Sequence, residues 1–190
     1  ITHRLLKRAN DTSSGFAFHY GRNLFQWELL MKKYGLWIVL ILVFAGIILG
    51  TLGTWSVPLG YGLSAFWPAI VVQVAGSAWF GGWGVLAAVL FPIFTNALAN
   101  VGLSGILGFI PGNLAQGLIP AWAFRHFRVD PAIPGRKGLA FYMIWGAIIP
   151  AAAGGLLGSA AVVFFGEASW SDYPLLVVKW AAPNMVVSLL

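Results

Sequence analysis

The chain has 190 residues, of which 59% are hydrophobic and 8% are charged, and its mean hydropathy is +0.85. A water-soluble core of this size cannot hide that much apolar surface, so the composition predicts an integral membrane protein. The net charge is +6, but basic residues beside membrane helices are typical of cytoplasmic flanks, and no nucleic-acid partner is expected. Cysteine is absent, which excludes disulfides and thiolate chemistry.

The first 35 residues are polar and basic, and they contain the aromatic-rich stretch "SSGFAFHYGRNLFQWELLMKK". Aromatic and basic residues mixed in this way are typical of an amphipathic segment that lies in the membrane interface. A docking arm for another subunit is the alternative. We therefore divide the chain into a cytoplasmic or interfacial segment, 1–35, and a transmembrane domain, 36–190.

Six apolar segments follow, each of a length suited to a membrane helix or slightly shorter. The expected fold is all-α, an integral membrane protein with six transmembrane helices and an N-terminal interfacial segment. The candidate spans, in chain order, are 36–55, 66–80, 84–101, 109–124, 139–165 and 174–190.

Basic residues indicate the orientation, because cytoplasmic loops are enriched in Lys and Arg. If the N-terminus is cytoplasmic, all basic residues but Lys179 fall on that side, and the outer loops 56–65, 102–108 and 166–173 contain none. The C-terminus then also lies in the cytoplasm, as expected of a multi-pass protein of the cytoplasmic (inner) membrane. The basic residues on the cytoplasmic side are Arg4, Lys7, Arg8, Arg22, Lys32, Lys33, Arg125, Arg128, Arg136 and Lys137.

Four side-chain amides lie in the stretch "FPIFTNALANVGLSGILGFIPGNLAQGLIP" (91–120). Asn96 and Asn100 are one helical turn apart. Asn113 and Gln116, on the next helix, are nearly one turn apart. In the expected topology all four share the outer half of the membrane and can face each other. An unpaired amide in hydrocarbon costs several kcal/mol, so the four either join helices or line a cavity.

Other polar and aromatic residues are expected at the same outer side. Trp55 and Tyr61 border the first outer loop, Glu167 and Trp170 the last, and Lys179 lies about 8 Å into the sixth span. Amides and aromatic faces around one or two charges suit a small polar ring compound. Alternatively, the aromatic residues form an interfacial belt, and Lys179 reaches the headgroups or pairs with Glu167 or Asp172.

Small residues at a spacing of four indicate close helix packing. Gly46 and Gly50 form such a pair in the first span, and Gly154 and Gly158 in the fifth.

Catalytic chemistry is not indicated. His3, His19 and His126 are all assigned to the cytoplasmic side, which leaves no histidine in the bilayer for haem, and no cluster suits a metal. The sequence also shows no phosphate loop, no paired intramembrane carboxylate and no nucleophile with its base. We expect neither an enzyme nor a bound cofactor.

Three features are considered together: the size of the chain, its six spans with both ends inside, and Gly/Pro-rich helices such as "GFIPGNLAQGLIPAWAF". In these features the chain resembles the S components of energy-coupling-factor (ECF) vitamin transporters. The resemblance implies a subunit that binds a vitamin or other small solute for uptake. It also implies partners, namely a membrane coupling subunit and ATPase subunits. A small-residue motif on the first helix contacts the coupling subunit in that family, and Gly46 and Gly50 occupy the matching place, although alanines are more typical there.

Two alternatives stay open. Membrane sensor domains of signalling proteins also show "WP" near the start of a span, as in "FWPAIVVQVAGSAWFGGW". A structural subunit of a larger membrane complex would use the N-terminal arm as its tether.

Overall fold

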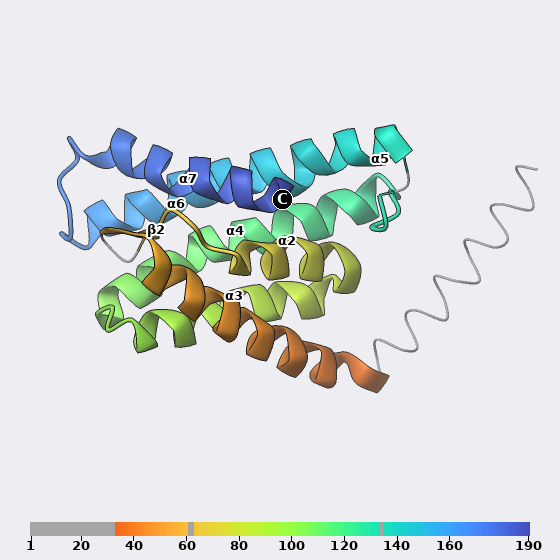
Figure 1. Ribbon diagram of the computed structural model, residues 1–190, viewed down its shortest axis with the longest axis horizontal. Coiled ribbons are helices and arrows are strands. Elements are labelled where there is room, and N and C mark those ends of the chain that lie inside the picture. The colour runs from red at the N-terminus through yellow and green to blue at the C-terminus, as the bar shows by residue number, and fades with distance from the viewer. Residues whose placement is uncertain (1–32, 61–62, 134) are drawn as a thin grey trace, which may run out of the picture. The chain divides into compact units, whose positions relative to one another are not determined.

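The computed structural model describes residues 33–60, 63–133 and 135–190, and the fold is shown in Figure 1. The expected interfacial segment, apart from its last residues, and Tyr61 lie outside the described residues. Residues 36–190 form one unit. Helices make up almost all of it, which confirms the predicted all-α class.

Each of the six expected spans coincides with a helix or a run of helices. In chain order the elements are a helix Lys33–Ser56, strands β1 (Pro58–Gly60) and β2 (Leu63–Ser64), and helices α2 (Ala69–Phe80), α3 (Gly82–Leu98), α4 (Leu103–His126), α5 (Gly135–Tyr142), the π-helix η1 (Met143–Ile148), α6 (Ile149–Phe164) and α7 (Tyr173–Leu189).

Two boundaries differ from the expectation. Helix α4 begins at Leu103 rather than at residue 109, so most of the expected loop 102–108 is helical. The glycines of this stretch tolerate the helix because α4 is packed by its neighbours, and tertiary packing outweighs the low helix propensity of glycine. The first outer loop contains the antiparallel hairpin β1–β2, which the sequence did not indicate.

Among the residues that the structure describes, two helices are long and apolar enough to cross a membrane. They are Lys33–Ser56 and the continuous run Gly135–Phe164. Helices α2 and α3 are apolar but shorter, with 12 and 17 residues. Six crossings therefore remain a prediction.

Glycine and proline set the local geometry of the helices. Gly81 has φ 59° and makes the tight turn from α2 to α3. The π-helical turn η1 ends just before Pro150. Proline has no N–H to donate to the carbonyl four residues earlier, and a π-turn is one way in which a helix accommodates that loss.

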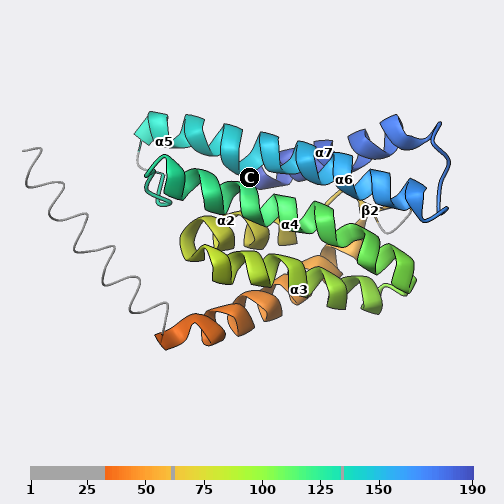
Figure 2. The same ribbon diagram turned by 180° about the vertical axis from the view of Figure 1, so that it is seen from behind.

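Helix α4 packs against α2, α3 and α6, and α7 packs on α6 (Figures 1 and 2). Glycines allow the close approach. A Cβ on Gly112 would lie 3.0 Å from the carbonyl oxygen of Gly154, and a Cβ on Gly117 would lie 2.9 Å from the Cβ of Ala88. The Gly154/Gly158 pair therefore serves packing within the chain.

The helix connections gather at two ends of the bundle. The hairpin and the loops 99–102 and 165–172 lie at one end, called the hairpin end, and the loop 127–133 lies at the other, called the basic end (Figure 1). Glu167 and Asp172 belong to the hairpin end. Arg125, Arg128, Asp130, Arg136 and Lys137 belong to the basic end.

Candidate functional site

A buried amide pair joins α2 to α4. Gln73 is fully buried, and its Nε2 donates hydrogen bonds to the Ala88 carbonyl oxygen and to Asn113 Oδ1, both at 3.0 Å. A backbone carbonyl can only accept, so this contact fixes which atom of the Gln73 amide is nitrogen. The oxygen of Asn113 must therefore face Gln73, which leaves the Asn113 Nδ2 donors for other partners.

Asn113 also lines a small cavity of about 40 Å³ between α3, α4 and α7, beneath β2. We call it the inner cavity. Its polar side chains are Ser64, Asn96, Asn113, Lys179 and Asn184, with the indole N–H groups of Trp67 and Trp180, and no acidic side chain lines it. Its full lining is Leu63, Ser64, Trp67, Pro92, Asn96, Phe109, Asn113, Lys179, Trp180 and Asn184.

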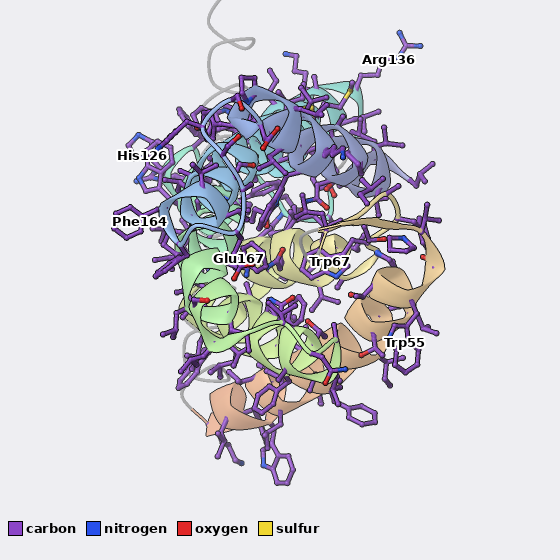
Figure 3. The ribbon with its side chains drawn as sticks, turned by 90° about the vertical axis from the view of Figure 1, so that its left-hand side faces the viewer. Trp55, Trp67, His126, Arg136, Phe164 and Glu167 are labelled. Atoms are coloured by element: carbon purple, nitrogen blue, oxygen red, sulfur yellow. The ribbon has the colours of Figure 1, made fainter. Side chains whose placement is uncertain are left out.

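A larger cleft of about 500 Å³ lies at the hairpin end, and we call it the outer cleft. Leu63 and Phe109 line both spaces, so the two adjoin. In Figure 3, which looks onto this end, Glu167 and Trp67 lie towards the middle and Trp55 at the edge. The cleft is lined by Thr54, Trp55, Pro58, Leu63, Leu98, Ala99, Asn100, Val101, Gly102, Gly105, Phe109, Val162 and Glu167.

The four predicted amides do not form one cluster. Asn96 and Asn113 line the inner cavity, and Asn100 lines the outer cleft. Gln116 lines neither, because it is fully buried against α6, where a Cβ on Gly154 would lie 2.6 Å from its Nε2. Neither atom of the Gln116 amide has a hydrogen-bond partner among the described residues.

Lys179 is half-buried in α7 and lines the inner cavity. Among the residues that the structure describes, its ammonium makes no hydrogen bond and no ion pair, so neither Glu167 nor Asp172 is its direct partner. Asp172 belongs to the exposed loop before α7. Hydrogen bonds from the Ser169 hydroxyl and backbone N–H lower the pKa of its carboxyl, and the charge of Lys179 contributes a smaller part.

The predicted aromatic walls are only partly present. Trp55 lines the outer cleft with 69% of its side chain exposed. Trp170 lines neither space and contacts the ring of Tyr173, with the centroids 5.9 Å apart. The inner cavity instead has Trp67, Phe109 and Trp180 as its large aromatic residues.

Sequence reasoning missed Gln73 and Asn184. Both are amides within apolar spans, which is the same signal that identified Asn96 and Asn113, and applying it to the whole chain would have found them. Trp67 and Trp180 gave no such signal, since Trp is common in the spans.

Gly46 and Gly50, expected to meet a partner subunit, pack on α3 of the same chain. A Cβ on Gly46 would overlap the ring of Phe91, and one on Gly50 would lie 2.7 Å from Thr95 Cγ2. The pair is therefore used for an internal contact.

No group of His, Cys and carboxylate side chains suited to a metal ion occurs in the described part of the chain. Comparison of the chain with protein-family models, with curated proteins and with solved structures gave no match.

Proposed function

We propose that the chain is a multi-pass protein of the cytoplasmic membrane that binds a small polar solute at its outer face, as an ECF-type S component does. In this proposal the helices cross six times, both termini are cytoplasmic, and the hairpin end faces outward. The segregation of charge supports the orientation, because Arg125, Arg128, Arg136 and Lys137 gather at the basic end.

Exposed apolar side chains support the membrane setting. In the helix Lys33–Ser56, Trp37, Ile41 and Phe44 are all more than 60% exposed, and Phe164 at the end of α6 is 78% exposed. Contiguous apolar surface of this kind is unfavourable in water and is satisfied by lipid tails or by another apolar protein surface.

The observation that carries solute binding is the inner cavity. Three Asn side chains and one Lys converge there from α3, α4 and α7, and of these only Asn113 makes a side-chain hydrogen bond within the described residues. Amides that merely joined helices would be paired with one another. The adjoining outer cleft, at about 500 Å³, has a size typical of small-molecule sites.

ATP-driven uptake of the ECF type would require a membrane coupling subunit and ATPase subunits as partners, because the sequence contains no phosphate loop. Since Gly46 and Gly50 face α3, the coupling subunit would contact the opposite face of the helix Lys33–Ser56. Leu40 and Phe44 are exposed on that helix.

Native mass spectrometry of the gently solubilised protein tests the proposal by recording any retained small molecule and any co-purifying subunit. We expect the wild type to carry a small polar molecule and Asn96→Ala to lose it. Val186→Ala is the matched control, because this exposed side chain lines neither cavity.

Retention of the same molecule by wild type and Asn96→Ala would place the solute elsewhere. A wild type that is empty and bound only within a larger assembly would favour the structural role. A solute without ATPase partners would favour the sensor over uptake.

A further inference from the structure

The inner cavity contains a positive charge that no side chain of the described residues neutralises directly. Lys179 is the one charged group in its lining. It makes no ion pair within the described ranges, and Asp172, which its charge influences, lies in the exposed loop before α7 and does not line the cavity. An ammonium in partly apolar surroundings is stabilised by an anion, because fewer water molecules can solvate it there. The cavity therefore favours a negatively charged group.

Asn113 also favours an anion, because its remaining hydrogen-bonding groups are donors. Its oxygen is occupied by Gln73 Nε2 at 3.0 Å, and that arrangement is fixed by the Ala88 carbonyl. What Asn113 has left to offer is the pair of Nδ2 donors. A cation and an N–H donor lining one cavity are the groups that bind a carboxylate through charge-assisted hydrogen bonds.

The two adjoining spaces differ in size and charge. The inner cavity, at about 40 Å³, suits one small headgroup, whereas the outer cleft is about 500 Å³ and includes Glu167 in its lining. A second anionic group in the outer cleft would be repelled by Glu167. A single carboxylate at the inner end, with an uncharged body in the cleft, fits both spaces.

We infer that the solute is a small organic monocarboxylate whose anionic end lies between Lys179 and Asn113 and whose body extends past Leu63 and Phe109 into the outer cleft. This assignment rests on the proposed solute-binding function and adds the chemical class of the ligand. The amides of Asn96 and Asn184 line the same cavity and can donate to the same carboxylate.

The experiment uses pairs of compounds of equal shape that differ in charge. Benzoate, phenylacetate, indole-3-acetate and hexanoate are each titrated beside their own carboxamide into the full chain in detergent, with the melting temperature as the readout. We expect at least one carboxylate, and none of the carboxamides, to raise the melting temperature of the wild type.

Two variants locate the anionic end. Lys179→Met should weaken binding of that carboxylate by roughly tenfold or more, because a charged hydrogen-bond partner is lost. Asn113→Asp keeps the acceptor for Gln73 but replaces the donor with oxygen, and it should weaken binding in the same way. Val178→Met introduces methionine at the neighbouring exposed position. This control variant should bind the carboxylate as the wild type does.

Several results would overturn the inference. Equal binding of a carboxylate and its carboxamide, unchanged binding in Lys179→Met, or no stabilisation by any carboxylate would each exclude a carboxylate held at Lys179. The proposed function is judged separately, since a neutral molecule found by native mass spectrometry and lost in Asn96→Ala would leave it standing.

Discussion

At the residue scale, the buried amides differ in whether they have partners. Gln73 Nε2 donates two hydrogen bonds, to Ala88 and Asn113. Within the described part of the chain the Gln73 amide lacks a partner only at Oε1, whereas both amide atoms of Gln116 have none. Both side chains are fully buried. A buried polar group without a partner is destabilising, and one that is paired is roughly neutral or stabilising. The same substitution should therefore destabilise the fold at position 73 and not at position 116.

Gln73→Met should lower the free energy of unfolding by about 1–2 kcal/mol, because it leaves Asn113 Oδ1 without its donor. Gln116→Met keeps the volume and removes an unpaired amide, so the free energy of unfolding should stay unchanged or rise by about 1 kcal/mol. Denaturant titration in detergent micelles measures both. If Gln116→Met lowered the free energy of unfolding by a similar amount, the Gln116 amide would have a partner important for stability.

At the scale of elements, Gly46 and Gly50 let the helix Lys33–Ser56 pack closely on α3. A Cβ at either position meets Phe91 or Thr95, while a Cβ at Gly82 meets nothing within 4 Å. The small-residue pair was predicted from the sequence, but its contact is within the chain. Spacing alone reveals a close approach without identifying the helix that approaches.

Gly46→Ala should lower the free energy of unfolding by about 1–3 kcal/mol through overpacking against Phe91. Gly82→Ala should leave it unchanged or raise it slightly, since alanine favours a helix more than glycine does. Thermal unfolding monitored by circular dichroism compares the two variants. Equal destabilisation of both would contradict the packing of this helix on α3.

The helices themselves could be predicted because each is a long apolar run, and burial or lipid contact favours a helix for such a run. The candidate site could be predicted only in part. Asn100 lies beyond the end of α3, and its φ of 58° is not helical. Helical spacing from Asn96 therefore does not predict where its side chain lies. Gln116 is three residues from Asn113, and the rotation of about 60° between them turns one towards α6 and the other towards α2.

At the scale of the whole molecule, an apolar bundle with segregated charge at its two ends contains a polar cavity. Lys179 and Val178 are neighbours on α7 with different surroundings. Lys179 lines the inner cavity, and Val178 is 60% exposed on the surface. In a membrane that surface is covered by lipid, whereas the cavity adjoins the outer cleft.

The most direct measurement of this claim is the reaction of single cysteines in intact cells with a small, membrane-impermeant thiosulfonate. The natural chain has no cysteine, so Lys179→Cys and Val178→Cys can each be measured without background. We expect rapid modification of Lys179→Cys from outside and none of Val178→Cys, because thiolate forms in a wet cavity and not in lipid. Modification of Val178→Cys at an equal rate would contradict the membrane setting. An unreactive Lys179→Cys would contradict an outward-facing solute cavity.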